Sequence, residues 1–149
     1  MSGTNPYQGK VRVRICGVLI ENRQILLVKH LGLGPAGYFW SPPGGGIEFG
    51  ESHGQTLQRE FREETGLEIT ASDFIAFHEH IDDRFHALEL FFKADKTGGL
   101  LRIGAEPESP ESGPFLDEIR WFSWPELKQI PEICRHSLCE QFLLEHSGD

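Results

Sequence analysis

The sequence predicts a mixed α/β fold in which a mixed β-sheet has helices on both faces. Segments with strand patterning stand before and after a central helical segment, and another helical segment ends the chain. The 149 residues are 38% hydrophobic, which is enough to enclose one hydrophobic core. We therefore expect a single domain over residues 1–149.

Two strands are predicted near the N-terminus. In VRVRICGVLI, residues 11–20, apolar residues first alternate with arginines and then become continuous, as in a strand that enters a core. The segment ILLVKH, residues 25–30, is also typical of a strand. The four residues ENRQ between them favour a hairpin that pairs the two strands.

One amphipathic helix is predicted over residues 53–65, after a glycine-rich loop at 31–38 and a turn that contains three glycines. Ser52 and Gln55 have the spacing of a capping box, which satisfies backbone N–H groups at the start of a helix. Gly66 suits the left-handed position that ends a helix.

The second half of the chain predicts more strands and two helices. Ser123 and Pro125 indicate the start of a short helix, and residues 131–146 indicate a C-terminal helix. The segment 96–114 is rich in Gly, Pro, Ser and Glu and is predicted to be an exposed excursion. β-branched and aromatic residues indicate strands at 69–81, 86–95 and 118–124.

Charge and composition exclude several classes of function. The formal charge of −9 argues against a protein that binds duplex nucleic acid, because such proteins carry a basic surface. A divalent cation would still allow an acidic protein to bind small phosphorylated ligands. No apolar segment approaches the roughly 20 residues that cross a bilayer, so we expect no membrane association. The polar N-terminus lacks the apolar core of a signal peptide, and the three cysteines form no CxxC, which predicts a cytoplasmic location.

Three glutamates, Glu60, Glu63 and Glu64, crowd one side of the predicted helix. At about 100° per residue they fall within an arc of roughly 100°, beside the apolar Leu57 and Phe61. Like charges four residues apart cost a helix a few tenths of a kcal/mol, so something outside the helix should offset their repulsion. On the helix alone, a solvated face with salt bridges is the simpler interpretation, and a metal site is the alternative.

The spacing between this helix and the preceding glycines changes the interpretation. Residues 45–67 fill every fixed position of the pattern GX5EX7REUXEEXGU, in which U is a bulky apolar residue. The chain therefore resembles the Nudix family, whose signature motif, the Nudix box, has this form. Trp40 and Pro43 precede the glycines, as is frequent in the family. The strand pattern fits the Nudix α/β/α sandwich over nearly the whole chain.

The resemblance implies a divalent-metal site on the acidic face. Hard carboxylate oxygens suit Mg²⁺ or Mn²⁺, and a glycine turn lets a backbone carbonyl approach the ion. The resemblance also implies that Arg59 orients the glutamates and that Glu51 supports the junction between loop and helix or a second ion. The predicted metal ligands are Gly44, Gly45, Glu51, Glu60, Glu63 and Glu64. The predicted catalytic residues are Arg59, Glu60, Glu63, Glu64 and Glu118.

Glu118 enters this set because many Nudix enzymes take a base or a further ligand from a late loop. Asp117 is the second candidate for that role, and an exposed acid at a strand edge accounts for Glu118 equally well. Further candidates in the preceding Gly- and Pro-rich segment are Glu106, Glu108 and Glu111.

Histidines and basic residues outside the motif are also candidates for ligand binding. His78 and His80 share one face of a predicted strand with His86 nearby, which is either a transition-metal site or a solvated strand face. The cations that are candidates for contact with substrate phosphates are Arg12, Arg14, Lys29 and Arg84.

These features predict a divalent-metal-dependent hydrolase that cleaves the pyrophosphate bond of nucleoside diphosphate-linked compounds by attack of water on phosphorus. The alternative is a Nudix-fold sensor that binds such compounds without cleaving them, although sensors tend to lose glutamates of the box and this chain keeps them. The expected partner is a small nucleotide or nucleoside diphosphate derivative, and homodimers are common in the family. The residues leave open whether the substrate is ADP-ribose, a nucleotide sugar or a modified nucleoside triphosphate.

Overall fold

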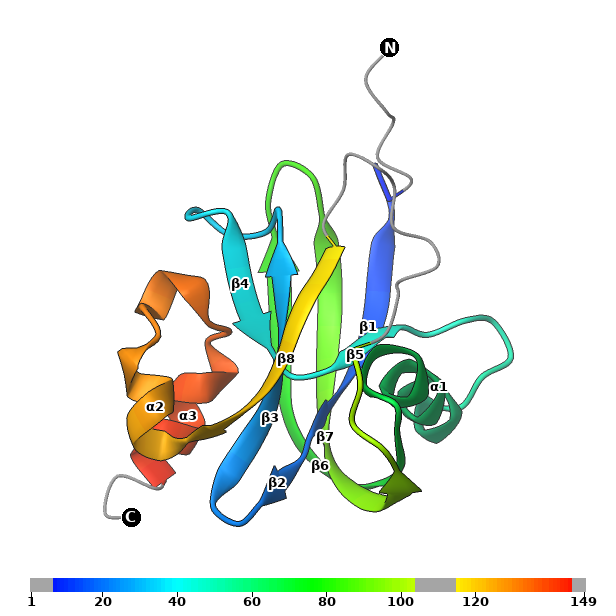
Figure 1. Ribbon diagram of the computed structural model, residues 1–149. Helices are drawn as coiled ribbons and strands as arrows, with labels where there is room; N and C mark the ends of the chain where they lie inside the picture. The colour runs from blue at the N-terminus through cyan, green and yellow to red at the C-terminus, as the bar shows by residue number, and fades with distance from the viewer. Residues whose placement is uncertain (1–6, 104–114, 146–149) are drawn as a thin grey trace.

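A computed structural model describes residues 7–103 and 115–145 of the chain, and its centre holds two four-stranded sheets (Figure 1). The mixed sheet has the strand order β5-β1-β7-β6, in which only β1 and β7 are parallel. In the second sheet, β3 pairs antiparallel with β2, β4 and β8. The strands are β1 Val11–Val18, β2 Ile20–Glu21, β3 Gln24–Leu31, β4 Tyr38–Ser41, β5 Gly44–Gly46, β6 Leu67–Ile81, β7 His86–Gly99 and β8 Phe115–Ser123. The helices are α1 His53–Thr65, α2 Trp124–Gln129 and α3 Leu138–Glu145, with a short 3₁₀ helix at Glu132–Cys134.

The predicted hairpin forms only at its turn, and its extension along β1 is wrong. β1 pairs in parallel with β7 along its whole length, and only the dipeptide β2 pairs with the start of β3. Asn22 and Arg23 connect β2 to β3 with φ values of 51° and 63°, the geometry of a tight hairpin turn. The apolar run that begins at Ile15 is almost fully buried, which suits a central parallel strand better than one arm of a hairpin.

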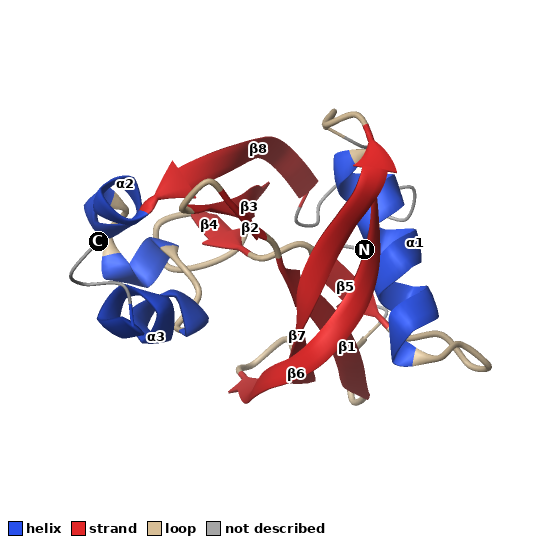
Figure 2. Cartoon of the chain, turned by 90° about the horizontal axis from the view of Figure 1, so that it is seen from below, coloured by secondary structure: helices blue, strands red, loops and turns tan. Residues whose placement is uncertain are grey.

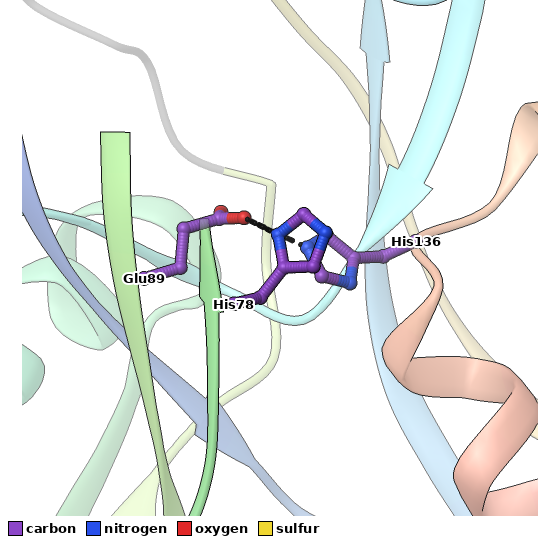
Figure 3. Close-up of side chains that lie close together, drawn as sticks. All are labelled: His78, Glu89 and His136. Carbon is purple, nitrogen blue, oxygen red and sulfur yellow. Dashed lines mark hydrogen bonds and ion pairs between the residues drawn. The ribbon is translucent and has the colours of Figure 1, made fainter. Parts of the chain in front are cut away.

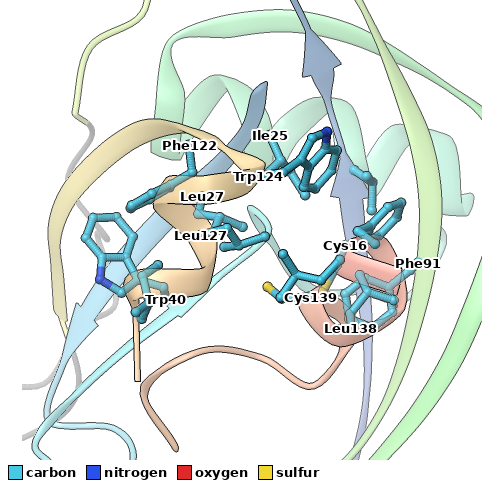
Figure 4. Packing of buried hydrophobic residues seen from close by; sticks show 14 of the residues in the cluster. Cys16, Ile25, Leu27, Trp40, Phe91, Phe122, Trp124, Leu127, Leu138 and Cys139 are labelled. Carbon is cyan, nitrogen blue, oxygen red and sulfur yellow. The ribbon is translucent and has the colours of Figure 1, made fainter. Parts of the chain in front are cut away.

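Helices cover both faces of the sheets, so the predicted α/β/α sandwich is confirmed. Successive side chains of a strand point to opposite faces. Alternate residues of β1 and β3 therefore lie in two separate cores, one on each face. Cys16 and Leu27 pack with α2 and α3 (Figure 4), whereas Ile15 and Leu26 pack with α1. Figure 2 shows α1 beside the mixed sheet, and α2 and α3 at the opposite side of the molecule.

Helix α1 begins and ends as predicted. The Ser52 hydroxyl accepts a hydrogen bond from the N–H of Gln55, and the Gln55 side chain accepts one from the N–H of Ser52. Gly66 ends the helix with a φ of 76°. Phe61 is fully buried beneath the helix and lies against Gly17 of β1, where a Cβ atom would be 3.0 Å from the phenyl ring. The absence of a side chain at position 17 therefore lets α1 pack closely on the mixed sheet.

Two short strands, β4 and β5, lie where the sequence analysis predicts no strand. β5 consists of three glycines, which have no intrinsic preference for a strand. It forms because its backbone pairs antiparallel with β1, with Gly45 opposite Ile15. This pairing places a glycine backbone at the edge of the mixed sheet, next to α1 (Figure 1).

The C-terminal helix is shorter than predicted, whereas the short helix before it is confirmed. Ser123 caps α2 with the predicted geometry. Arg135 is extended and forms a bridge with Trp40 of β4, so α3 begins only after this stretch. The N–H of His136 donates to the C=O of Trp40 at 2.9 Å, which fixes His136 beside the sheets. Within the described part of the chain, no helix is long and apolar enough to cross a membrane.

The predicted strands of the second half are confirmed, with differences at their ends. β7 continues through Gly99, so the segment predicted as an exposed excursion begins as a strand. β8 begins earlier than predicted, at Phe115.

Replacing Phe61 by Ala should lower the free energy of unfolding by about 3–5 kcal/mol, because the loss of a fully buried ring leaves a cavity under α1. Phe49→Ala is the matched control, since the Phe49 side chain is fully exposed and should contribute less than about 0.5 kcal/mol. Urea denaturation of the two variants measures both values. Equal losses in the two variants would contradict the placement of Phe61 in the core.

Candidate active site

Helix α1 approaches β5 so closely that the strand has no room for a side chain at Gly45. A Cβ atom at Gly45 would lie 2.4–2.7 Å from the carboxylate atoms of Glu60. On the other side of the strand, a Cβ at Gly44 would lie 2.2 Å from the carbonyl oxygen of Ile15. The glycines are therefore required by packing, and they admit the acidic side chains of α1 to the backbone of β5.

Arg59 ties the acidic residues together through one guanidinium group. Its Nε and Nη2 donate to Glu51 at 2.8 and 2.9 Å, and its Nη1 donates to Glu60 at 2.9 Å. Nη2 also donates to the C=O of Gly46 at 3.2 Å, and Nη1 lies 3.6 Å from a carboxylate oxygen of Glu63. Arg59 thus has the contacts expected of a residue that orients the glutamates.

The carboxylate of Glu51 accepts hydrogen bonds from three residues. In addition to the Arg59 contacts, its Oε1 accepts from the N–H of Glu48 at 3.0 Å and from the hydroxyl of Thr56 at 2.9 Å. The hydrogen bonds from Arg59 are the main cause that lowers the pKa of Glu51 from 4.5 to about 2. Because it already binds donors from the loop and from the helix, Glu51 is better suited to supporting the junction between them than to binding an ion.

The other three glutamates of the predicted site differ in burial. Burial raises the pKa of Glu60 above its ordinary value, although Arg59 acts in the opposite direction. Glu64 is only 3% exposed, and its Oε1 accepts from the N–H of Gly44 at 2.9 Å. The side chain of Glu63 is 39% exposed, which makes it the most open of the three.

The oxygen atoms that α1 and β5 bring together fit the coordination of a hard divalent cation. Carboxylate and backbone carbonyl oxygens are the ligands that Mg²⁺ and Mn²⁺ prefer. Burial disfavours the charged form of the Glu60 carboxylate, and a bound cation would offset that cost. The predicted residues that the structure brings together here are Gly44, Gly45, Glu51, Arg59, Glu60, Glu63 and Glu64.

Glu118, predicted as a catalytic residue, is placed elsewhere. It lies in β8 opposite Lys29 of β3, and its neighbour Ile119 packs toward the core under α1. Because successive side chains of a strand point to opposite faces, Glu118 points away from α1. Asp117 lies 3.7 Å from the Lys29 ammonium group in an ion pair. The other candidates of this group, Glu106, Glu108 and Glu111, lie outside the described residues.

The three strand histidines do not converge on one site. His80 pairs with Asp82 at 2.8 Å, and His86 pairs with Glu79 at 2.8 Å, both on the surface. His78 instead turns toward a buried carboxylate of the neighbouring strand.

That carboxylate, Glu89, belongs to a network that the sequence analysis missed. Its partners are Arg14, His78 and His136, each at 2.9 Å. Burial acts to raise the pKa of Glu89, but the hydrogen bond from His136 and the charge of Arg14 hold it at about 2. A charged residue within the apolar segment HALELFF was a usable signal, because buried carboxylates need partners. No local pattern indicates that His136, 47 residues away, is one of them.

The family follows from comparison with known proteins. A family model described as the NUDIX domain matches residues 10–138. The chain belongs to the Nudix family. A MutT NUDIX hydrolase from Burkholderia pseudomallei is 22% identical, with a TM-score of 0.69 over 92% of this chain and 98% of that one. A NUDIX hydrolase from Nitrosomonas europaea is 22% identical, with a TM-score of 0.70 over 93% and 89%. At this identity, the likeness to both structures shows the Nudix fold alone.

Curated relatives of this Nudix chain match over part of their length. The ADP-ribose pyrophosphatase of Methanocaldococcus jannaschii is 31% identical over 101 residues, which are 66% of this chain and 59% of that protein. The CTP pyrophosphohydrolase of Escherichia coli is 32% identical over 65 residues, which are 44% of this chain and 48% of that protein. The matched segments therefore span about half the length of these relatives.

The lowered pKa of Glu51 predicts a loss of stability in acid. An acid whose pKa falls on folding stabilises the folded Nudix domain above its unfolded pKa, and this contribution is lost as the pH falls from 4.5 to about 2. Glu51→Gln should be less stable than the native chain at neutral pH and should lose less stability across this range. Urea denaturation at stepped pH measures both. A native acid dependence in Glu51→Gln would contradict the interpretation.

Proposed function

We propose that this Nudix protein is a divalent-metal-dependent hydrolase that cleaves the pyrophosphate bond of nucleoside diphosphate-linked compounds. The observation that carries the proposal is the gathering of Glu60, Glu63 and Glu64 against the β5 glycines, with Arg59 bound to their cluster. Residues 45–67 also retain every fixed position of the Nudix box, which fits an enzyme better than a sensor.

The cation would lie between the acidic face of α1 and the backbone of β5. A divalent cation held there supplies charge neutralisation for the phosphates and increases the acidity of the attacking water. Glu51 is assigned a positioning role, because its oxygens already accept hydrogen bonds from three residues. The residues that would hold the cation are Glu60, Glu63 and Glu64, with a backbone carbonyl of Gly44 or Gly45.

Arg59 keeps the glutamates in place before the cation binds. It joins Glu51, which precedes α1, to Glu60 in the middle of the helix, and so limits the motion of both side chains. Its charge also reduces the repulsion between Glu60 and Glu63. Glu63 is the most exposed of the three carboxylates, so it is open to solvent.

The substrate class is supported by the names of two relatives, ADP-ribose pyrophosphatase and CTP pyrophosphohydrolase. Both names refer to cleavage at a pyrophosphate linkage of a nucleotide derivative. The match to the first relative is longer, with 101 residues against 65. We therefore place ADP-ribose first among the compounds to test.

The purified protein should hydrolyse at least one compound of a panel that contains ADP-ribose, CTP and nucleotide sugars, with Mg²⁺ or Mn²⁺ and not with EDTA. In ¹⁸O-labelled water, mass spectrometry should find the label on a phosphate product, because water attacks phosphorus. Label on a carbon-bound oxygen would contradict the assigned bond. Binding of these compounds without turnover would favour the sensor instead.

Glu63→Gln should lower turnover roughly 100-fold and reduce the rise in melting temperature that Mg²⁺ produces, because it removes one anionic ligand at nearly constant shape. The metal-free protein should remain folded, since Glu63 is 39% exposed and its contact with Arg59 is 3.6 Å long. Activity assays and thermal melts with and without Mg²⁺ measure the two effects.

Glu68→Gln is the matched control, because Glu68 is an exposed glutamate that pairs with Arg62 outside the site. It should leave turnover and the Mg²⁺ response unchanged. Native turnover together with a native Mg²⁺ response in Glu63→Gln would rule out this residue as a ligand.

A further inference from the structure

The network around Glu89 lies on the face of the mixed sheet opposite α1. Glu89 shares a face of β7 with Phe91, which packs in the core formed with α2 and α3. Its Oε2 accepts from Nη1 of Arg14, and its Oε1 lies 2.9 Å from both Nδ1 of His78 and Nε2 of His136 (Figure 3). Residues from β1, β6, β7 and the extended stretch before α3 therefore meet at one carboxylate.

His78, Glu89 and His136 have the composition of a metal site, and their ligand atoms lie within 4.8 Å of one another. The hydrogen bonds argue against this use. Nδ1 of His136 accepts from the N–H of Leu138 at 3.0 Å, so Nε2 carries the proton and donates to Glu89. A ring nitrogen must lose its proton before it binds a metal, and the charge of Arg14 beside Glu89 also disfavours a second cation.

The network instead orients Arg14. Glu89 and His136 are buried, with 5% exposure each, so they form a fixed support. The side chain of Arg14 is 23% exposed, which leaves it accessible from solvent. Its second nitrogen, Nη2, lies 3.5 Å from the carbonyl oxygen of Gly44, at the long limit for a hydrogen bond. Nη2 of Arg14 is therefore a donor that could form a shorter hydrogen bond with a ligand than it forms with Gly44.

The glycine strand β5 separates Arg14 from the acidic cluster. Gly45 faces Glu60 on the α1 side, whereas a Cβ at Gly46 would lie 3.0 Å from Nη2 of Arg12 on the other side. Arg12 and Arg14 lie on the same face of β1, because they are two residues apart in a strand. A ligand that lies across β5 thus meets carboxylates on one side and two guanidinium groups on the other.

A diphosphate that shares a divalent cation with the protein matches this arrangement of charge. Some of its oxygens need the cation that the carboxylates hold, and the others remain anionic and need donors. A guanidinium group binds two phosphate oxygens at once, which a lysine ammonium cannot do.

We propose that Arg14 is a substrate-binding residue, whose guanidinium group contacts phosphate oxygens beside the carbonyl group of Gly44. Glu89 and His136 are positioning residues that hold this guanidinium group in place. The ligand class, a nucleoside diphosphate-linked compound, rests on the proposed function. The contact itself requires only the diphosphate group, so it is testable without turnover.

ADP is the probe, and calorimetry measures its affinity in the presence of Mg²⁺. Arg14→Lys keeps the charge and loses the planar fork, so ADP should bind roughly 10-fold more weakly. Glu89→Gln keeps the size of the support and loses its charge, and should weaken ADP binding to a similar extent. Arg120→Lys is the matched control, because Arg120 pairs with Glu126 on the surface of β8, and it should bind ADP with native affinity.

Two further measurements separate this role from a structural one. The rise in melting temperature with Mg²⁺ reports on the acidic cluster and should stay native in Arg14→Lys and Glu89→Gln. On any hydrolysed substrate, KM should rise roughly 10-fold in Arg14→Lys while kcat changes by less than about 2-fold, because the lost contact is uniform binding.

Native ADP affinity in Arg14→Lys, or no ADP binding by the native protein, would overturn the proposal. If Arg14→Lys and Glu89→Gln lose both ADP binding and the Mg²⁺ response, the proposal is also overturned, because the loss of both would show that β5 had been disrupted. One tightly bound Zn²⁺ in the native protein that His136→Ala abolishes would show a metal centre in its place. If the native protein binds ADP through Arg14 and hydrolyses no compound of the panel, the hydrolase fails and this inference stands.

Discussion

The close contact between α1 and a strand without side chains is the constraint on which the site depends. Gly45 leaves room for the Glu60 carboxylate where any other residue would place a Cβ atom. The same backbone donates an N–H to Glu64 and offers carbonyl oxygens to Arg59 and Arg14. Since β5 is held in register by β1, these contacts fix the acidic helix and the basic face of the sheet relative to each other. Three residues of backbone therefore connect both halves of the site.

Two kinds of carboxylate stand around this backbone, and their hydrogen bonds distinguish them. Glu51 and Glu89 each accept from three different residues and have pKa values of about 2, so they serve as fixed anionic supports for an arginine. Glu60 shows the opposite response, because burial raises its pKa above the ordinary value. Glu63 is the most solvent-exposed ligand candidate. Carboxylates that accept hydrogen bonds from several residues position other groups, whereas a largely buried carboxylate with a single donor among the described residues, such as Glu60, is suited to a cation.

Features that depend on neighbours in the chain could be predicted from the sequence. The cap at Ser52, the left-handed Gly66 and the acidic arc of α1 follow from residue spacing, and the structure has the first two as expected. The pairing of β1 with β7, the strand character of β5 and the direction of Glu118 depend on tertiary contacts instead. The hydrogen bond between His136 and Glu89 depends on the extended stretch at Arg135, which interrupts the predicted C-terminal helix. Local propensity carries no information about such partners.

The extended stretch before α3 links the end of the chain to the basic side of the site. His136 donates to Glu89 only while this stretch is docked on β4, so local opening of the C-terminal segment would remove one of the three partners of the carboxylate. The free energy of such openings ranges from almost zero up to that of global unfolding. An anion that binds only the docked state must also stabilise that state, by thermodynamic reciprocity. For such an anion, ligand affinity and the hydrogen-exchange protection of the last helix would be two measures of one local equilibrium.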